Sequence, residues 1–519
     1  MGILSSPAVL TALAILVTLG LYRLSHVGRR DPRLPPGPPT IPVLGNLHLI
    51  PITGMHKDLL AWGEKYGSVF SLKLGPGTMI VLNDRKAVHE LLDKRSALYS
   101  DRPKDYMAKL VTNLDNMAHM HNDHIWRAQR KVAAHNLSPR LLDANVAPLQ
   151  EAEMAILLHD LLRTPNKFFD HIKRSTGSVA NIIIWGHRGA TYESFWGYNV
   201  YRSLEGYSRS LEIGANPPVD QFPFLQRIPD FLAPWKRRAK LSYKIMADTW
   251  AEARRLAEKR RAAGERRPAM FDRIVDGETK LDVRHTDTQL NHFLGTMVEA
   301  GAETSASGML TSLLYLAISP QVQAKAHKEL DEVCGSERSP KWSDLERLPY
   351  INCIVKEGMR IRPVGPLGVP HCAKQDDWYN GFLIPKDAMI LMPIWAIHRY
   401  ESNGFENPDQ YNPDRYMNHK RLGSELTGIP DYENRDNYGA GRRVCVGMHL
   451  AERTVWRMTA KILWAYELVP VDVDPSNFHE GIQHYPEPFK VEFRPRSEAH
   501  VRTIVREAEP ALEFLSKYE

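Results

Sequence analysis

Residues 437–447 read Asn-Tyr-Gly-Ala-Gly-Arg-Arg-Val-Cys-Val-Gly and place Cys445 in a glycine- and arginine-rich loop before a helical stretch. A thiolate in such a loop is a suitable axial ligand for haem iron, and it donates electron density that favours cleavage of an O–O bond. Gly441 and Gly447 allow backbone N–H groups to approach the sulfur. Arg443 is suited to pair with a haem propionate. A cysteine taken alone is more often a small buried hydrophobe, so the haem interpretation needs support from the rest of the chain.

The same loop resembles the haem-ligand loop of the cytochrome P450 family, whose pattern is Phe-x-x-Gly-x-Arg-x-Cys-x-Gly. Gly441, Arg443, Cys445 and Gly447 occupy its defined positions, and by this resemblance Cys445 would bind the iron of haem b. One position departs, because Tyr438 stands where the family usually has phenylalanine. The aromatic ring is kept, but the added hydroxyl needs a hydrogen-bond partner if it is buried.

A second pattern, Ala-Gly-Ala-Glu-Thr-Ser at residues 300–305, lies inside a long apolar helical stretch. Glycine inside a helix is usually tolerated at a cost of up to about 1 kcal/mol relative to alanine. Here the small Gly301 and a threonine that competes for helix carbonyls would together open a polar notch. The segment resembles the oxygen-activation motif of cytochrome P450s. By this resemblance Thr304 would hydrogen-bond dioxygen, and Glu303 would help relay protons from solvent.

Helical spacing extends this site along the same helix. Phe293, Met297, Ala300 and Thr304 fall at i, i+4, i+7 and i+11, so they share one face. The spacing predicts that Phe293, Met297 and Ala300 line a substrate pocket above the iron. The alternative that these are ordinary core residues stays open.

Glu357 and Arg360 sit at i and i+3 of one predicted helix, close enough to form an ion pair. Most such pairs are exposed and contribute only about 0–1 kcal/mol. The two residues resemble the Glu-x-x-Arg pair of cytochrome P450s, which is buried and joined by an arginine from a later loop. Residues 411–416 resemble that loop, so Arg415 would complete a structural group that locks the thiolate side of the haem pocket.

Other site residues are assigned by resemblance to the family alone. Trp126 and Arg130 resemble its Trp-x-x-x-Arg pair, which reaches the haem propionates. His371 occupies a place where the family often has another propionate partner. The pocket wall would include four further parts of the chain: Val364, Leu367, part of residues 112–120 and the turn near Tyr485.

The composition is that of an ordinary globular protein with enough apolar material for a large core: 519 residues, 43% hydrophobic and 25% charged. A formal charge of +6 is a mild excess over so large a surface and does not indicate a nucleic-acid binder. The basic stretch Lys236–Arg267 has interleaved glutamates and an apolar side, which predicts a solvated amphipathic helix. Four cysteines without a close pair argue against a disulfide framework or zinc ribbon and favour a reducing compartment.

The N-terminus contains 20 consecutive uncharged residues, Ile3–Tyr22, about the length needed to cross a bilayer. Arginines follow this stretch and none precedes it, which predicts that the bulk of the protein stays on the cytoplasmic side. A cleaved signal peptide is the alternative, but such peptides have a cationic start and a shorter apolar run. We therefore expect a single-pass anchor at residues 1–22, a basic and proline-rich spacer at 23–42 and a haem-binding catalytic domain at 43–519. Cytochrome P450s have similar proline stretches past their anchor, which implies the endoplasmic reticulum membrane.

The remaining pattern is mostly helical. Residues 68–82 alternate around a Gly-Pro-Gly turn and predict a β-hairpin. Helical periodicity covers these stretches: 84–95, 123–135, 140–163, 236–262, 286–318, 320–334, 343–361 and 447–466. Short strand patterns recur at 366–373, 378–384, 388–392 and 488–494. We expect a mainly α fold with a small β-rich region, the cytochrome P450 fold, with an N-terminal transmembrane anchor.

The resemblance implies a haem-thiolate monooxygenase that inserts one oxygen atom of O2 into a small organic substrate and releases the other as water. NADPH would supply the electrons through a membrane-bound cytochrome P450 reductase, with cytochrome b5 as a second donor. Lys131, Arg442 and Arg443 would help dock an acidic partner at the thiolate side. Two other classes stay open: a thiolate-haem isomerase or dehydratase that does not use O2, and a non-catalytic haem sensor or electron carrier. The first tends to lose the acid-threonine pair, and the second would not need an open distal pocket.

The expected substrate is a small apolar or aromatic molecule. Residues 441–454 and 363–371 resemble fungal cytochrome P450s of polyketide pathways, especially those that hydroxylate small phenols such as m-cresol or m-hydroxybenzyl alcohol in patulin-type biosynthesis. This resemblance implies a phenolic intermediate of fungal secondary metabolism. The apolar, proline-broken stretch Phe222–Trp235 is predicted to touch the bilayer beside the anchor and to border a substrate entrance.

Overall fold

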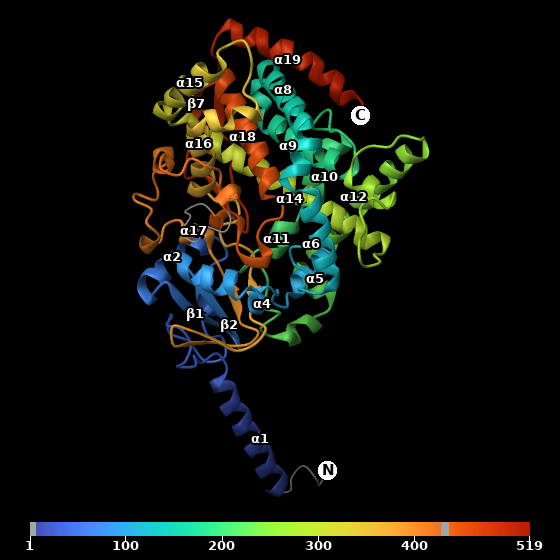
Figure 1. Cartoon of the computed structure of the whole chain (residues 1–519). Coiled ribbons are helices and arrows are strands. Elements are labelled where there is room, and N and C mark those ends of the chain that lie inside the picture. The colour runs from blue at the N-terminus through green and yellow to red at the C-terminus, as the bar shows by residue number, and fades with distance from the viewer. Residues whose placement is uncertain (1–6, 427–434) are drawn as a thin grey trace.

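The computed structural model describes residues 7–426 and 435–519, which form a predominantly helical body with the hairpin of residues 69–82 at one end and strand β7 (Tyr466–Asp472) toward the other (Figure 1). Helix α1 (Pro7–His26) projects away from the end that contains the hairpin. Most of its apolar side chains from Leu13 onward are exposed. Within the described ranges, no helix combines the length and the apolar character needed to span a membrane. The predicted anchor at residues 1–22 begins in the six N-terminal residues that lie outside the described part.

The longer helices build the body. They are α2 (Met55–Tyr66), α6 (His124–Asn136), α8 (Ala147–Arg163), α9 (Phe168–Trp185), α12 (Pro234–Ala262), α14 (Asp287–Ala317), α15 (Pro320–Cys334), α16 (Pro349–Ile361), α18 (Met448–Ala465) and α19 (Glu498–Ser516). Shorter helices connect them: α3 (Arg85–Val88), α4 (Ser96–Tyr99), α5 (Tyr106–Thr112), α7 (Pro139–Leu141), α10 (Phe195–Ser203), α11 (Tyr207–Leu211), α13 (Met270–Val275) and α17 (Ile394–Ile397).

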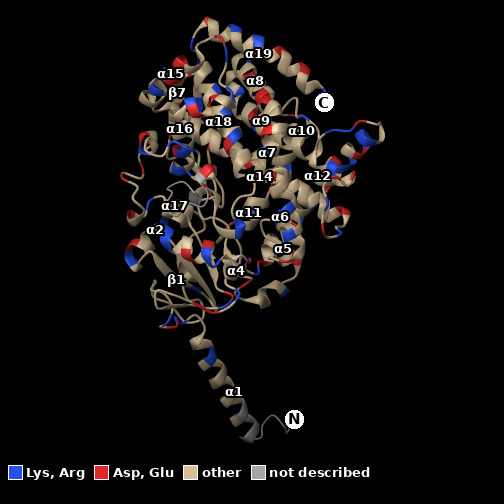
Figure 2. Ribbon diagram, viewed as in Figure 1, with Lys and Arg blue, Asp and Glu red and all other residues tan. Residues whose placement is uncertain are grey.

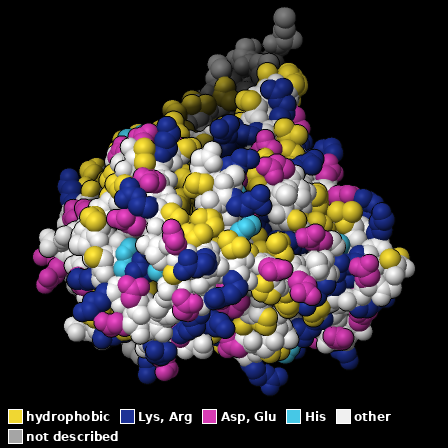
Figure 3. All heavy atoms as spheres, turned by 90° about the horizontal axis from the view of Figure 1, so that it is seen from above, with side chains coloured by type: hydrophobic (Ala, Val, Ile, Leu, Met, Phe, Trp, Pro, Cys, Tyr) yellow, Lys and Arg dark blue, Asp and Glu magenta, His cyan; other side chains and the backbone are white. Residues whose placement is uncertain are grey.

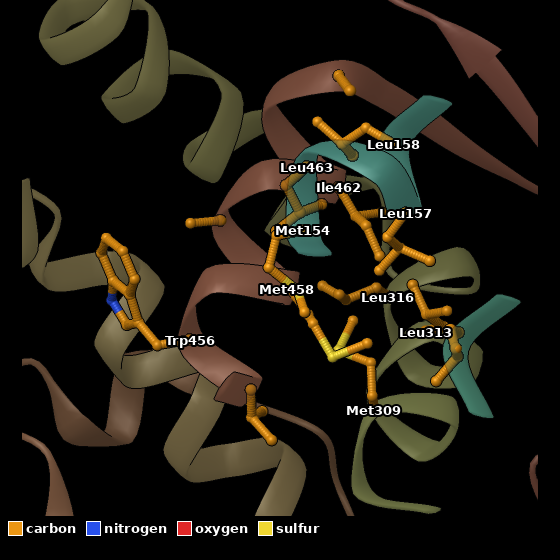
Figure 4. Packing of buried hydrophobic residues seen from close by; sticks show 14 of the residues in the cluster. Met154, Leu157, Leu158, Met309, Leu313, Leu316, Trp456, Met458, Ile462 and Leu463 are labelled. Atoms are coloured by element: carbon orange, nitrogen blue, oxygen red, sulfur yellow. The ribbon is translucent and has the colours of Figure 1, made fainter. Parts of the chain in front are cut away.

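Helix α14 runs through the middle of the body and packs against α9, α12, α16 and α18 (Figure 1). A capping box fixes its start, because Thr286 and Gln289 each bond the other's backbone N–H. Its C-terminal half lies in the largest core cluster, where side chains of α8, α14 and α18 meet, among them Met154, Met309 and Met458 (Figure 4). This packing fixes the helix that carries the predicted oxygen-activation motif.

The predicted hairpin is confirmed by β1 (Val69–Leu74) and β2 (Gly77–Leu82), which pair antiparallel. They belong to a sheet of order β1-β2-β6-β3, in which β6 (Met389–Leu391) runs parallel to β2 and antiparallel to β3 (His371–Cys372). Further two-stranded sheets pair β10 (Lys490–Pro495) with β7 (Tyr466–Asp472), β4 (Asp377–Tyr379) with β5 (Phe382–Ile384) and β8 (Phe478–Glu480) with β9 (His484–Pro486). The expectation of a mainly α fold with a small β-rich region is thus confirmed.

Some elements differ from the sequence prediction. The strand expected at 366–373 is only two residues long, because prolines in this stretch lack the N–H donor of a strand ladder. The helix expected at 84–95 continues beyond α3 as a π-helical segment, His89–Lys94. Helices α9 and α19 were not predicted. The Ser-Thr-Gly-Ser run in α9 and Pro510 inside α19 are poor helix formers and obscure the apolar period.

The proline-rich segment after α1 packs on the body. The backbone N–H of Ser71 in β1 donates to the carbonyl of Pro36 at 2.7 Å. Arg30 donates from Nη1 to the carbonyl of Ser71 at 2.8 Å and from Nη2 to that of Pro38 at 2.9 Å. The stretch predicted as a spacer between residues 23 and 42 is therefore docked on β1 and belongs to the folded body from Arg30 onward.

Charged side chains of both signs are interspersed over the surface, without a large area of one sign on the face shown (Figures 2 and 3). Helix α12 shows this mixture, while Met246 and Trp250 on its other side are buried. The amphipathic interpretation of the basic stretch is thus confirmed.

Candidate functional site

Cys445 follows the short turn Gly441–Arg443 and lies at the N-terminal end of α18. Its residue surface is accessible, whereas the other three cysteines are buried. The site is nevertheless recessed: desolvation by the surrounding protein raises the pKa of the thiol, while the backbone N–H of Gly447 and the guanidinium of Arg130 lower it. The protein thus holds one accessible thiol in its interior and directs an N–H group and a positive charge toward it.

The loop before the thiol depends on glycine. Gly441 has φ +61°, a left-handed conformation that favours glycine, and a Cβ there would lie 2.0 Å from the carbonyl oxygen of Leu92. Its backbone N–H donates to Asp93 Oδ1 at 2.8 Å. The loop is therefore pressed against the segment His89–Lys94, and that contact sets the position of the thiol.

Arg443 points into the protein. Its Nε donates to the carbonyl of Ser100 at 2.8 Å, and its Nη2 donates to the carbonyl of Met120 at 2.7 Å. The guanidinium carbon lies 3.9 Å from the centre of the Trp126 ring, a stacking distance. Because Arg443 is buried, it does not belong to the predicted docking surface, whereas Arg442 is exposed.

Arg130 and His371 lie on the same side of the site. Arg130 Nη2 donates to the carbonyl of Val444, the residue before the thiol. His371 Nδ1 donates to the carbonyl of Tyr99 at 2.8 Å. Burial and nearby guanidinium groups lower the pKa of His371 to about 3, so its ring is neutral at pH 7. With the ring proton on Nδ1, Nε2 can donate to a carboxylate only after the ring takes up a second proton. An adjacent negative charge favours that protonation.

A third arginine, Arg102, joins this group although the sequence did not single it out. It donates to three backbone carbonyls: Ala118 at 2.8 Å, Val369 at 3.0 Å and Pro370 at 2.7 Å. Burial and the charges of Arg443 and Arg130 lower its pKa well below the ordinary value. Burial also lowers the pKa of Arg443 to about 10. Clustered buried cations beside an accessible thiol fit a group that carries two carboxylates and a metal able to take one thiolate, and haem b is such a group.

Glu357, Arg360 and Arg415 lie in contact. Arg360 donates from Nε and Nη2 to the two carboxylate oxygens of Glu357 at 2.7 and 2.8 Å, and both side chains have no exposed surface. Arg415 Nε donates to Glu357 Oε2 at 3.1 Å, and the backbone N–H of Asn412 donates to Oε1 at 2.8 Å. Burial alone would lower the pKa of Arg360, but the carboxylate raises it above its ordinary value. The pair therefore ties α16 to the loop that contains Arg415.

On α14 the predicted catalytic residues have few partners. Thr304 Oγ1 donates to the carbonyl of Ala300 at 2.6 Å, and Ala300 is exposed although it lies in the middle of a largely buried helix. Burial raises the pKa of Glu303, while Lys173 and a hydrogen bond with Ser307 lower it. Glu303 Oε2 has no hydrogen-bond partner among the described residues. This face of α14 thus keeps polar groups available.

The residues predicted to line the pocket fall into two groups, one buried and one accessible. Phe293 is 0% exposed and Met297 is 8% exposed, and both belong to a core cluster with α6, α9 and α12. Phe293 therefore supports the wall from behind instead of lining it, because neighbouring helices cover its whole ring. Val364 is half-buried, and its Cγ2 faces α14 at Gly308. Leu367 is buried in the cluster under β1 and β2. Among these predicted wall residues, only Ala300 and Val364 have substantial accessible surface.

Glu299 is a buried acid that the sequence prediction missed. Its Oε1 accepts a hydrogen bond from Trp250 Nε1 at 2.8 Å, and it also bonds Ser203. Burial raises the pKa of Glu299 to about 7. Gly295 makes room for the indole, since a Cβ there would lie 2.4 Å from Trp250 Cδ1. The available signal was a glutamate inside an apolar run, one turn before Glu303.

Comparison with known proteins identifies the family of the site. The sequence profile described as "Cytochrome P450" matches residues 35–493. The chain is 38% identical to the cytochrome P450 monooxygenase macC of Penicillium terrestre, covering 98% of each chain. It is 37% identical to the cytochrome P450 monooxygenase patI of Aspergillus clavatus, covering 96% of each. Among solved structures, a zebra fish cytochrome P450 with abiraterone superposes with a TM-score of 0.68 at 22% identity, over 86% of this chain and 100% of that one, which shows a shared fold.

Proposed function

Because the chain belongs to the cytochrome P450 family and is one of its haem-thiolate monooxygenases, we propose that it hydroxylates a small phenolic, polyketide-derived compound of fungal secondary metabolism. The observation that carries the proposal is the accessible Cys445 thiol at the start of α18, a helix packed against the α14 helix that bears Glu303 and Thr304. Fungal relatives named as monooxygenases support the reaction class.

The residues of the thiol side would hold haem b. Cys445 would bind the iron through its thiolate, and the Gly447 N–H would stabilise the negative charge on the sulfur. Arg443 and Arg130, with Trp126 beneath Arg443 and His371 beside them, would bind the two propionates. Gly441 would keep the loop close to its support. When bound there, haem b would supply the activation of dioxygen and the transfer of one oxygen atom to the substrate, with electrons from NADPH through a separate reductase.

Glu303 and Thr304 would transfer protons on the α14 side of the site. Burial raises the pKa of the Glu303 carboxyl, and its Oε2 has no hydrogen-bond partner among the described residues, so it is suited to take up and release a proton. Thr304 Oγ1 donates to a helix carbonyl and keeps its lone pairs free to accept a further hydrogen bond. These groups disfavour an isomerase or dehydratase without O2, because such enzymes tend to lose the acid-threonine pair. A haem sensor is disfavoured because it would not need an open distal pocket.

The substrate would bind beside Ala300 and Val364. A methyl group and a branched aliphatic side chain give a small apolar surface, which suits an aromatic ring. The hydroxyl group of a phenol would need a polar partner in the same region, and the acid-threonine pair on α14 lies next to Ala300. The proposal of a phenol rests on these surfaces and on the resemblance of residues 363–371 and 441–454 to phenol-hydroxylating relatives.

The protein would be held on the endoplasmic reticulum membrane with its catalytic body in the cytoplasm. Support comes from the exposed apolar side chains of α1 and the arginines that follow them. Phe224 and Phe231, in the stretch before α12, are 67% and 72% exposed and would touch the same bilayer. Full solubility of a protein lacking residues 1–30, with no effect of Phe224→Ser and Phe231→Ser on membrane binding, would refute this placement.

Reductase and cytochrome b5 would dock on the thiol side. Arg442 is exposed there, and Lys131 forms an exposed ion pair with Asp282 at 2.8 Å, so both charges remain accessible to an acidic partner. Charge reversal at Arg442 is expected to slow electron delivery most at low ionic strength.

The substrate proposal is tested by following the haem absorption change when small phenols or fatty acids displace water from the iron. We expect m-cresol-like phenols to give a saturable change. A response to long-chain lipids alone would refute the phenol.

The role of Thr304 is tested by Thr304→Ala, for which product formed per NADPH consumed should fall roughly 100-fold. Thr296→Ala is the matched control, because Thr296 Oγ1 makes the same type of bond to the His292 carbonyl, at 2.7 Å. Equal loss in both variants would contradict the proton role.

A further inference from the structure

Tyr438 replaces the phenylalanine of the family pattern and is buried. Its backbone carbonyl accepts the N–H of Cys445 at 2.7 Å. Its hydroxyl donates to Met359 Sδ on α16 at 3.4 Å and also interacts with the Glu452 carboxyl on α18. One side chain therefore connects the thiol loop to the helix that follows it and to the helix of the Glu357–Arg360 pair.

The Glu452 carboxyl contacts both Tyr438 and the backbone of Ser424. It is buried, and both of its carboxylate oxygens accept the backbone N–H of Ser424, at 3.0 and 3.1 Å. The Tyr438 hydroxyl is a further polar neighbour of this carboxyl. Burial raises the pKa of Glu452 to about 7, since its two partners, Ser424 and Tyr438, carry no positive charge.

The two buried groups depend on each other. A buried carboxyl is stable only when donors satisfy its oxygens, and a buried phenol hydroxyl needs an acceptor. A phenylalanine at 438 would remove the hydroxyl that contacts Met359 and Glu452 and would release the ring from its fixed position. Because the carbonyl of the same residue holds the Cys445 N–H, a shift of the ring is transmitted to the thiol loop.

We propose that Tyr438 is a positioning residue for the Cys445 ligand, which it holds in place through the contacts of its hydroxyl with Met359 and Glu452. The proposal rests on the function proposed above, in which Cys445 binds the haem iron. It explains the departure from the family pattern: the hydroxyl adds a side-chain lock to a loop that other members close with a phenylalanine ring.

The test compares the full-length, haem-loaded protein with Tyr438→Phe, Glu452→Gln and the double variant. The measured quantity is the rate at which the reduced, carbon monoxide-bound protein converts on mild warming from the thiolate-ligated to the thiol-ligated absorption band. Tyr438→Phe is expected to convert about fivefold faster, the effect of one net buried hydrogen bond. The double variant should be no faster than the quicker single variant, because both changes remove the same bond.

Tyr466→Phe is the matched control, because the buried Tyr466 hydroxyl donates to the Leu158 carbonyl at 2.7 Å, away from the thiol loop. It should lower the melting temperature without changing the conversion rate. The positioning role would be overturned if Tyr438→Phe converted at the wild-type rate or if Tyr466→Phe converted as fast as Tyr438→Phe. Additive effects of the two changes in the double variant would also overturn it. A wild-type protein that never shows the thiolate-ligated band would instead overturn the proposed haem ligation.

Discussion

The two sides of the candidate site are built differently. Around Cys445, the groups are held by partners within the protein. Arg443 donates to backbone carbonyls, the Tyr438 carbonyl accepts the backbone N–H of Cys445, and Glu357 is enclosed by Arg360 and Arg415. On α14, Glu303 Oε2 has no hydrogen-bond partner in the described part of the chain, and Thr304 is bonded to its own helix. A group with several hydrogen-bond partners is fixed in one position, whereas a buried polar group without a partner remains available to bind another group.

This difference fits the two tasks. A thiolate ligand must keep one position against the iron, so its loop tolerates little change. A proton-handling side has to exchange partners during each cycle, so complete pairing there would hinder it. Substitutions on the thiol side are therefore expected to affect haem binding and stability, and substitutions on α14 should affect catalysis and pH dependence.

The largest effect is expected for Cys445→Ala. Removal of the sulfur leaves no axial thiolate, so the reduced, carbon monoxide-bound protein should lack the thiolate-ligated band, and product formation should be lost. Cys353→Ala is the control, because that cysteine is buried outside the site. A thiolate-type spectrum in Cys445→Ala would break the assignment of the thiol side.

The next effect is expected for Glu357→Ala, which leaves Arg360 buried without its carboxylate. The free energy of unfolding should fall by about 3–5 kcal/mol, and haem should be lost on purification. Lys325→Ala breaks the exposed Lys325–Asp414 pair and should cost less than about 1 kcal/mol. Denaturant unfolding measures both, and a similar small cost for both would show that the thiol side is less rigid than inferred.

Substitution of one glycine on each side allows the tolerance of the two sides to an added methyl group to be compared directly. Gly441→Ala places a methyl against the Leu92 carbonyl in a left-handed conformation, and we expect a loss of roughly 3 kcal/mol with reduced haem content. Gly301→Ala places a methyl at an ordinary distance of 3.7 Å from Ala180 Cβ, so it should be neutral or stabilise the helix by up to about 1 kcal/mol. Thermal melting with haem quantitation measures both variants. The reverse order would contradict the comparison.

The smallest effect is a pH dependence that belongs to the α14 side. The pKa of Glu299 is raised to about 7, so the folded protein binds an extra proton there, and stability is lost as pH rises from about 4.5 through 7. Glu299→Gln should remove this loss, gaining roughly 2 kcal/mol on the wild type between pH 5 and 8. Glu452 has a similar pKa and should leave a residual slope in the variant. Parallel stability curves for wild type and Glu299→Gln would refute the shift.

The candidate site residues could be identified from the sequence because they lie in short motifs. Cys445 with its glycines, the Glu303–Thr304 pair and the Glu357–Arg360 pair each lie within a few residues, so their resemblance to family motifs is visible in the sequence. Helical spacing adds that Glu357 and Arg360 share one helix face. Long helices such as α14 and α15 were found for the same reason, since their apolar period is local and sustained.

What remained for the tertiary structure concerns neighbours that lie far apart in the chain. Phe293 has the spacing of a pocket residue, but the helices packed around it cover the ring. Arg102 joins the cation cluster and Glu299 meets Trp250 only because the chain folds back on itself. The Tyr438 hydroxyl has a purpose only beside Glu452. Local sequence specifies which groups are present and how they are spaced along one element, whereas burial and partners are decided by packing between elements, because desolvation and hydrogen bonding depend on what surrounds a group in space.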